Sequence, residues 1–140
     1  MTATPDPESL LRGASLRVTR PRVAVLGAVH RHPHADTDAI VRVVREDLGE
    51  VSIRALYDGL RVLTAADLVR RIQPAGSAAR YESRVADNHH HLVCRACGAI
   101  ADVDFAFGQA PCLAASDDHG YAIEETEVTH WGLCPACAPP

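Results

Sequence analysis

The sequence has no lysine, few aromatic residues and no long apolar segment. All fourteen basic residues are arginine, a bias that the Arg codons of a GC-rich genome produce. Two Phe, one Trp and three Tyr leave the cores to be built mainly from Val, Leu, Ile and Ala. No apolar run approaches the roughly 20 residues needed to cross a bilayer, and the first residues do not resemble a signal peptide. We therefore expect a cytoplasmic protein with no membrane partner.

The chain also lacks net positive charge: its formal charge is −4, which by itself argues against nucleic-acid binding. The distribution is uneven, however. Residues 1–84 contain thirteen basic and ten acidic residues, a balance of +3, whereas residues 85–140 contain one Arg and eight acids, a balance of −7. Such asymmetry is typical of a nucleic-acid-binding half joined to another domain. With 140 residues, we predict two small domains, 1–84 and 85–140.

Cysteine is absent from the first domain, and all five cysteines follow it. Cys94 and Cys97 form one C-x-x-C knuckle, and Cys134 and Cys137 form another. Two such knuckles complete a tetrahedral four-cysteine site, the usual arrangement of structural Zn²⁺. The alternative is two unrelated redox or buried pairs. Cys112 lies outside the knuckles and is expected to be a small buried apolar residue.

The first half predicts three helices and a hairpin. Thr19 can cap a helix with Pro21 in its first turn, Asp36 or Thr37 can cap a second, and Ser52 a third. The core face of the third is predicted from helical spacing to contain Ile53, Leu56, Tyr57, Leu60 and Leu63, with Arg54, Asp58 and Arg61 opposite. Strands 68–72 and 79–82 would pair across a turn at 74–77. This is the outline of a winged helix-turn-helix, whose last helix enters the major groove.

The second half predicts a small α/β unit. Its expected strands are 92–94, 100–104 and 121–128, with one helix that begins after Pro111 and ends near Gly120. The fold class of the whole chain is therefore α+β.

Three consecutive histidines precede the first cysteine knuckle. In an extended segment, His89 and His91 would lie on one side and His90 on the other, while Asp102 and Asp104 would share a face of a nearby strand. Two imidazoles and a carboxylate make an N/O site that suits Fe²⁺, Mn²⁺, Co²⁺ or Zn²⁺. Further candidate ligands are Glu82 and either His32 or His34.

With these residues in place, the sequence closely resembles the ferric uptake regulator family over nearly its full length. The matching stretches are LRVTRPR (16–22), HPHAD (32–36), VSIRALY (51–57), RYE (80–82), HHHLVC (89–94), CGAIAD (97–102) and WGLCPAC (131–137). It is most similar to actinobacterial members of the peroxide-responsive branch, which repress catalase-peroxidase genes. The resemblance implies a homodimer, with an N-terminal winged-helix domain and a C-terminal α/β dimerisation domain in each protomer.

The resemblance also implies two metal sites. It supports structural Zn²⁺ on the four paired cysteines. It implies a regulatory site for Fe²⁺ or Mn²⁺, with Zn²⁺ possible in vitro, formed by His32, Glu82, His89, His91 and Asp102. Some relatives hold a further ion on the dimerisation domain, but two matching positions are Gln109 and Thr126 here, which are poor ligands.

We therefore expect a metal-dependent repressor that binds a palindromic operator in double-stranded DNA and responds to peroxide, iron or both. Its expected DNA-binding residues are Arg17, Arg20, Arg22, Arg54, Tyr57, Arg61, Arg70, Arg71 and Arg80. Three alternatives stay open. One is a pure sensor of iron, zinc or nickel within the family. Another is a zinc-ribbon scaffold for protein contacts, and the third is a zinc hydrolase, although the chain has no H-E-x-x-H motif.

Overall fold

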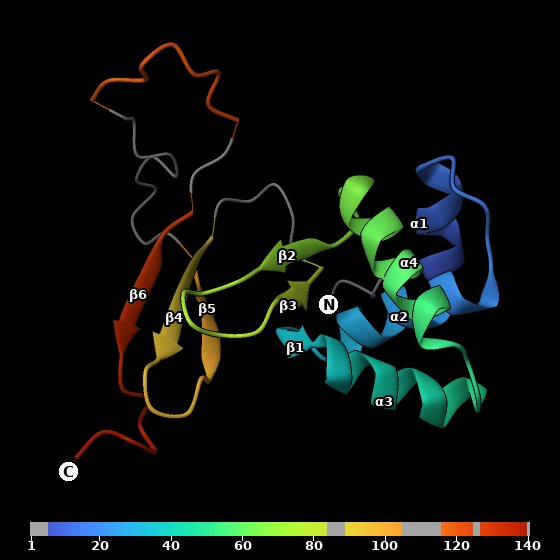
Figure 1. Ribbon diagram of the computed structural model, residues 1–140, viewed down its shortest axis with the longest axis horizontal. Coiled ribbons are helices and arrows are strands. Elements are labelled where there is room, and N and C mark those ends of the chain that lie inside the picture. Colours follow the sequence, from blue (N-terminus) through green and yellow to red (C-terminus); the bar gives the residue numbers. More distant parts are fainter. Residues whose placement is uncertain (1–5, 84–88, 105–115, 125–126, 140) are drawn as a thin grey trace. The chain divides into compact units, whose positions relative to one another are not determined.

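The computed structural model describes residues 6–83, 89–104, 116–124 and 127–139, and Figure 1 follows the chain through them. Its contacts divide the chain into two compact units, Met1–Val85 and Ala86–Pro140. In the described parts of both units, no helix has the length and apolar character needed to span a membrane. Each unit is described by itself below.

Unit 1 contains the three predicted helices, and their start signals are confirmed. They are α2 (Arg20–Arg31), α3 (Thr37–Leu48) and α4 (Ile53–Ala65). Their N-cap side chains are Thr19, Asp36 and Ser52, each of which accepts a hydrogen bond from the backbone N–H three residues later at 2.9–3.3 Å.

A fourth helix, α1 (Pro7–Gly13), precedes them and was not predicted. Its start signal is nevertheless present in the sequence. Asp6 caps it by accepting a hydrogen bond from the backbone N–H of Ser9 at 3.2 Å, Pro7 occupies the first position and Glu8 lies in the first turn. Its one buried residue, Leu11, joins the core of unit 1. With so short an apolar pattern, periodicity alone did not reveal this helix.

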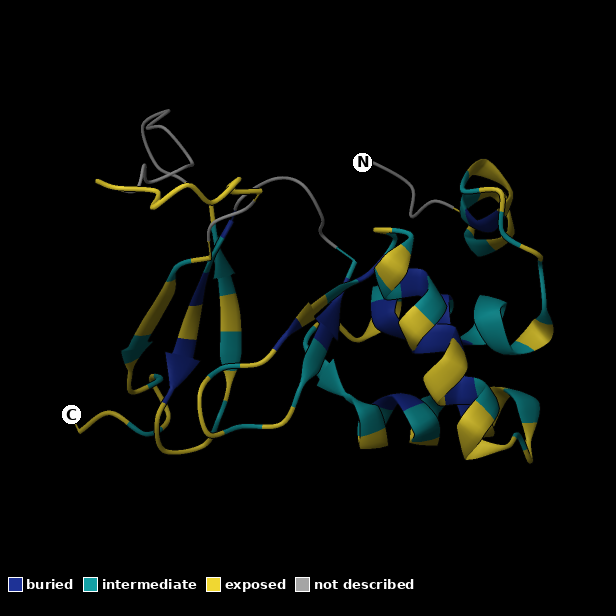
Figure 2. Ribbon diagram, turned by 45° about the horizontal axis from the view of Figure 1, so that its top comes forward, coloured by how far each residue is buried: buried dark blue, intermediate teal, exposed yellow. Residues whose placement is uncertain are grey.

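The core of unit 1 lies where α2, α3 and α4 meet, and Figure 2 shows the buried residues on their inner sides. From α4 it receives Leu56, Leu60 and Leu63, as predicted. The same prediction was wrong for Ile53 and Tyr57, which are 48% and 51% exposed. Ile53 begins the helix beyond the end of the core. Tyr57 points about 100° away from Leu56 around the helix axis, off the buried stripe.

The sheet of unit 1 contains the predicted hairpin and one additional strand. β2 (Arg70–Ile72) and β3 (Arg80–Glu82) pair antiparallel, and β1 (Ala35–Asp36) pairs with the other edge of β3, so the order is β1-β3-β2. In the hairpin turn, Ser77 donates its backbone N–H to the carbonyl of Pro74 at 3.0 Å. Gly76 has a φ of +78° there, which favours glycine.

Unit 2 contains a three-stranded sheet of order β5-β4-β6. The central strand β4 (His90–Cys94) pairs antiparallel with β5 (Ile100–Val103) and parallel with β6 (Thr129–Gly132). Figure 2 shows burial concentrated on β4. The first two strands agree with the sequence prediction to within two residues.

The prediction for the last part of unit 2 was wrong in position. Residues 121–124 and 127–128 form no strand, and the strand begins at Thr129 instead. The Val- and Ile-containing pattern indicated strand propensity, but pairing with β4 decides where a strand forms. The helix expected after Pro111 falls mainly on residues 105–115, outside the described residues. Its expected end at Gly120 is a turn with a φ of +82°.

Candidate metal centres

The four paired cysteines converge on one point. Their sulfur atoms all lie within 4.8 Å of one another, and none forms a disulfide. The Sγ atoms of Cys97 and Cys134 are 3.7 Å apart. A tetrahedral ion with Zn–S bonds of about 2.3 Å separates its sulfur ligands by about 3.8 Å, so this donor set fits Zn²⁺.

Backbone turns hold the two knuckles in place. Gly98, with a φ of +79°, closes the first turn by donating its N–H to the carbonyl of Cys94 at 3.0 Å. Cys137 closes the second by donating to the carbonyl of Cys134 at 2.9 Å. The pairing of β4 with β6 brings the two knuckles together. The N–H of Arg95, in the first knuckle, donates to the carbonyl of Gly132, just before the second knuckle, at 2.8 Å. A segment of more than thirty residues between the knuckles therefore does not separate them in space.

The pKa values of Cys94 and Cys137 depart from the ordinary thiol value in opposite directions. Hydrogen bonds from the backbone of Cys134, and next from that of Cys97, lower the pKa of Cys94 to about 6. Hydrogen bonds with the neighbouring sulfurs, that of Cys134 first, raise the pKa of Cys137 to about 12. The metal-free cluster therefore holds a thiolate at Cys94 and a proton at Cys137 near neutral pH. Binding of Zn²⁺ to four thiolates releases that proton.

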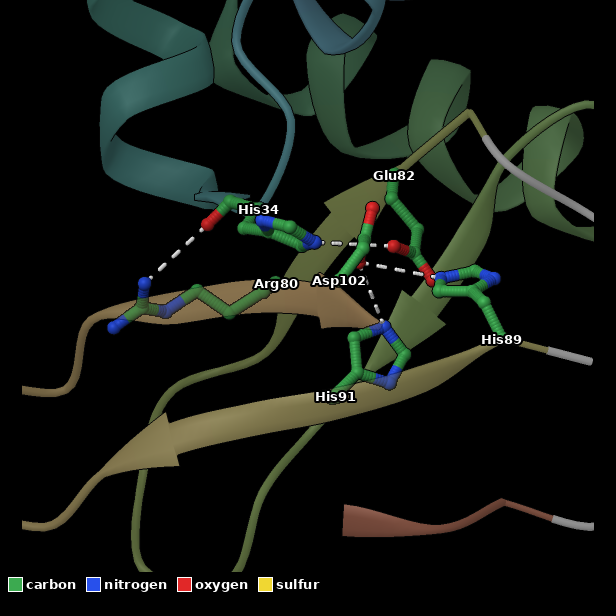
Figure 3. A network of polar contacts seen from close by, with 6 residues as sticks. All are labelled: His34, Arg80, Glu82, His89, His91 and Asp102. Atoms are coloured by element: carbon green, nitrogen blue, oxygen red, sulfur yellow. Dashed lines mark hydrogen bonds and ion pairs between the residues drawn. The ribbon is translucent and has the colours of Figure 1, made fainter. Parts of the chain in front are cut away.

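The second group of donors in unit 2 lies on β5, on β4 and directly before β4. His91 is directly opposite Asp102 in the antiparallel register. The Oδ1 atom of Asp102 lies 3.3 Å from Nε2 of His89 and 3.5 Å from Nε2 of His91, as Figure 3 shows. Both histidines are buried. Ligands of one first-row ion are about 3.0–3.5 Å apart at bond lengths near 2.1 Å, so the distance from Asp102 to each of the two histidines fits a shared metal.

Unit 1 holds a separate acid–histidine pair. Nε2 of His34 lies 3.2 Å from Oε2 of Glu82, and the two side chains are 12% and 1% exposed (Figure 3). The β1–β3 register explains the pair, because Ala35 is opposite Tyr81, which brings the preceding residue His34 opposite Glu82. His32, by contrast, is exposed and caps the C-terminus of α2. The histidine that the structure brings to Glu82 is thus His34, and ligation by His32 stays an untested prediction.

Three features fix the position of His34. Its φ is +67°, a conformation that few non-glycine residues adopt and that requires support from the surroundings. Its N–H donates to the carbonyl of Tyr81 at 2.9 Å. Its carbonyl accepts a hydrogen bond of 3.4 Å from Nη1 of Arg80, drawn in Figure 3. Arg80 was predicted to contact DNA, and in the structure it also supports the loop of this candidate ligand.

The remaining histidine of the cluster, His90, projects to the other face of β4. Its Nδ1 atom lies 3.2 Å from Nε2 of His130 on β6, with ring centroids 5.3 Å apart. Partial burial, and next repulsion by His130, lower the pKa of His90. The alternation predicted for the three histidines is therefore present in the structure, but nothing in the sequence indicated that His130 would meet His90.

The predicted DNA-binding residues of α4 lie on one exposed face. Arg54, Tyr57 and Arg61 are spaced by three and four residues and are all exposed, so they line one side of the helix. Arg71 on the hairpin is also exposed, whereas Arg70 and Arg80 are partly buried. Before α2, Arg17 and Arg20 are exposed, and Arg22 donates to the carbonyl of Arg17 at 3.0 Å.

Comparison with known proteins gives consistent matches. A sequence model described as the ferric uptake regulator family matches residues 13–130. The transcriptional regulator FurA of Mycobacterium tuberculosis is 64% identical over 138 residues, which is 99% of this chain and 94% of that protein. The peroxide-responsive repressor PerR of Staphylococcus aureus is 29% identical over 133 residues, covering 91% and 86%. The crystal structure of the Campylobacter jejuni peroxide stress regulator superposes with a TM-score of 0.66 at 21% identity, covering 93% and 95%.

Proposed function

This protein belongs to the ferric uptake regulator family, and from that premise we propose that a divalent metal, bound by His34, Glu82, His89, His91 and Asp102, switches it between DNA-binding and DNA-free states. Family membership makes the chain a transcriptional regulator and not an enzyme. The zinc-hydrolase alternative is therefore excluded. The proposal further includes a homodimer on a palindromic operator. Because its proposed partner is DNA, we also propose that the protein is located in the cytoplasm.

Two features of unit 1 support its role as the DNA-binding domain. Its charge is positive although the whole chain is acidic, so phosphate attraction is confined to this part. The helix α4 follows α3 after a short turn and exposes Arg54, Tyr57 and Arg61 along one side, as a recognition helix requires. The arginines of the hairpin and those near the start of α2 would then contact the DNA phosphates beside the major groove. These are Arg70, Arg71 and Arg80, and Arg17, Arg20 and Arg22.

The observation that carries the regulatory proposal is the presence of two incomplete N/O donor sets on different units. Unit 1 offers one imidazole and one carboxylate from His34 and Glu82. Unit 2 offers two imidazoles and one carboxylate from His89, His91 and Asp102. Neither set alone satisfies the five or six positions that Fe²⁺ or Mn²⁺ commonly fills. An ion that takes ligands from both would restrain the two units in one arrangement.

Such an ion acts through linkage. If the restrained arrangement is the one that places both recognition helices of a dimer on their half-sites, metal favours DNA binding and DNA must tighten metal binding by the same factor. The four-cysteine site has a different role, because a closed tetrahedral centre stabilises structure and offers no open position. We assign Zn²⁺ to the cysteines and Fe²⁺ or Mn²⁺ to the N/O ligands.

Peroxide sensing follows from the same ligands. Fe²⁺ held by these ligands would supply the electrons that activate hydrogen peroxide. A ligand imidazole would then gain one peroxide oxygen at a C–H bond, and the other oxygen would leave as water. The oxidised ring would no longer be a ligand, so the restraint on the units and the affinity for the operator would be lost. The second candidate function, a pure metal sensor, shares every step except this oxidation.

The test is operator binding measured by fluorescence anisotropy with Mn²⁺, Fe²⁺ or Zn²⁺ for the wild type and single variants. We expect His34→Ala and His89→Ala to lose metal-dependent binding. Loss in His32→Ala, with binding retained in His34→Ala, would instead assign the ligand to His32, as the family resemblance implies. His119→Ala is the matched control, because this histidine is exposed and lies outside both donor sets. Unchanged metal dependence in His89→Ala would refute the regulatory site.

A second measurement separates the two sensing modes. The Fe²⁺-loaded protein is treated with peroxide under anaerobic conditions and digested for mass spectrometry. We expect one added oxygen at His34, His89 or His91 together with loss of operator binding. If DNA binding survives peroxide, the protein is a pure metal sensor. If binding is lost with zinc release and unmodified histidines, the cysteines are the sensor instead.

A further inference from the structure

The sheet of unit 2 carries a second histidine pair that takes no part in the proposed function. In the parallel register of β4 and β6, His130 is opposite Leu92. Residues 90 and 92 share a face of β4 because side chains alternate along a strand, so His90 and His130 lie on the same face. His91, and with it Asp102, belongs to the other face. The pair is thus separated from the regulatory ligands by the sheet itself.

The distance between the two ring nitrogens fits a shared ion. Nδ1 of His90 and Nε2 of His130 are 3.2 Å apart. Two imidazoles that bind one tetrahedral ion at about 2.0–2.1 Å have their nitrogens about 3.3 Å apart. The same distance also fits a plain hydrogen bond between one protonated and one unprotonated nitrogen. The two explanations differ in a measurable way, because only the first predicts a stoichiometric metal.

We propose that His90 and His130 form an additional binding site for a divalent transition ion of the imidazole-preferring class, such as Ni²⁺, Zn²⁺ or Cu²⁺. The two strands supply two nitrogen ligands, and water completes the coordination. The surroundings favour a cation, because residues 85–140 carry a net charge of −7 and His130 is exposed to the solvent from which the ion arrives. The site does not depend on positions 109 and 126, where this chain has poor ligands.

A site with only two protein ligands binds more weakly than the four-cysteine and N/O sites, so it fills last. It also favours ions high in the Irving–Williams order over Mn²⁺ and Fe²⁺. The ion would link β6 to β4 at His90, which lies between His89 and His91 in the sequence. It therefore offers a second metal input, of different selectivity, at a position between the two regulatory histidines of unit 2.

The test is equilibrium dialysis of the untagged, zinc-loaded protein against Ni²⁺, with bound metal counted by mass spectrometry. The wild type should bind two Ni²⁺ per chain, and His130→Gln should bind one. His119→Gln, a substitution of another exposed histidine in unit 2, should still bind two. Glutamine keeps the size and polarity of the side chain, and circular dichroism verifies that the variant is folded.

A second variant keeps this result separate from the regulatory site. His91→Ala should lose the regulatory ion and retain the one at His90 and His130, while the double variant with His130→Gln should bind none. If His130→Gln loses no Ni²⁺ relative to the wild type, the pair is a hydrogen bond and the inference is refuted. Failure of the regulatory proposal alone would appear as unchanged binding in His91→Ala.

Discussion

The four-cysteine centre allows a quantitative prediction for Cys134→Ser. This substitution removes one of the four sulfur donors to the proposed Zn²⁺ and is expected to leave the backbone turn around it intact. The sulfurs of Cys97 and Cys134 lie 3.7 Å apart although the residues are 37 positions apart in the sequence. Zinc bound at this centre would therefore be a cross-link that joins the two ends of the long segment between the knuckles.

The size of the effect can be worked out from that separation. Closing a loop of this length costs the unfolded chain about 4 kcal/mol on the chain-entropy scale used for disulfides, and the cross-link removes that cost from folding. Among the described apolar residues of unit 2, only Val93 and Cys94 are buried. A fully buried apolar side chain contributes about 1.5–3 kcal/mol. The free energy lost with the cross-link is therefore about as large as the stabilisation that these two buried side chains provide. We expect unit 2 to unfold when the cross-link is lost.

Unit 1 should be unaffected, because its core of twelve buried residues contains no cysteine. Hydrogen exchange followed by mass spectrometry measures both units in one experiment. In Cys134→Ser, and in wild type treated with a strong chelator, amides of β4 should lose protection while those of α2 and α4 keep it. Cys112→Ser, which leaves both knuckles intact, is the matched control. Persisting protection of β4 after verified zinc loss would refute the reasoning.

Three further predictions concern unit 1. Burial lowers the pKa of His30, so the unfolded chain binds a proton at this histidine more tightly than the folded chain does. The free energy of unfolding should therefore fall as the pH drops through about 6.5. Urea titrations of His30→Gln should show a flatter pH profile than the wild type, and an unchanged profile would contradict the assignment. Ser52→Ala removes the cap of α4 and should destabilise unit 1 by about 1 kcal/mol, measured by thermal unfolding; no change in Tm would count against the cap. Arg71→Gln should reduce the slope of log K against log salt by about 1, and an unaltered slope would place this residue away from DNA.

The parts of the fold that could be predicted are those encoded locally. Helix starts at Thr19, Asp36 and Ser52 depend on a side-chain oxygen and a backbone N–H only a few positions away. The knuckles and their turns are equally local. The α4 face was predicted only in part, because periodicity shows which side of a helix is apolar but not where the neighbouring helices end. Ile53 lies beyond that end, and Tyr57 lies beside the buried stripe and is exposed.

Strand positions near the C-terminus depend on pairing with a distant segment. The sequence around 121–128 has the apolar residues of a strand, yet β6 begins at Thr129, where β4 provides its partner. The pair of His90 and His130 has the same origin, since it joins residues 40 positions apart. No local pattern signals a contact of this kind, so it became visible only with the register of the sheet.

The choice between His32 and His34 illustrates the same principle at a candidate ligand. The matching H-P pair favours His32 as the ligand, a prediction that stays untested. The pairing of β1 with β3, which begins 45 residues later, brings His34 to Glu82 instead. With Ala35 opposite Tyr81 and Asp36 opposite Arg80, continuing the register brings His34 opposite Glu82, while a residue two positions earlier would lie beyond the end of β3. A two-residue strand leaves no periodic trace in the sequence. The left-handed backbone of His34 is the local strain that this pairing maintains, and it turns the imidazole toward the carboxylate with which we propose it shares a metal.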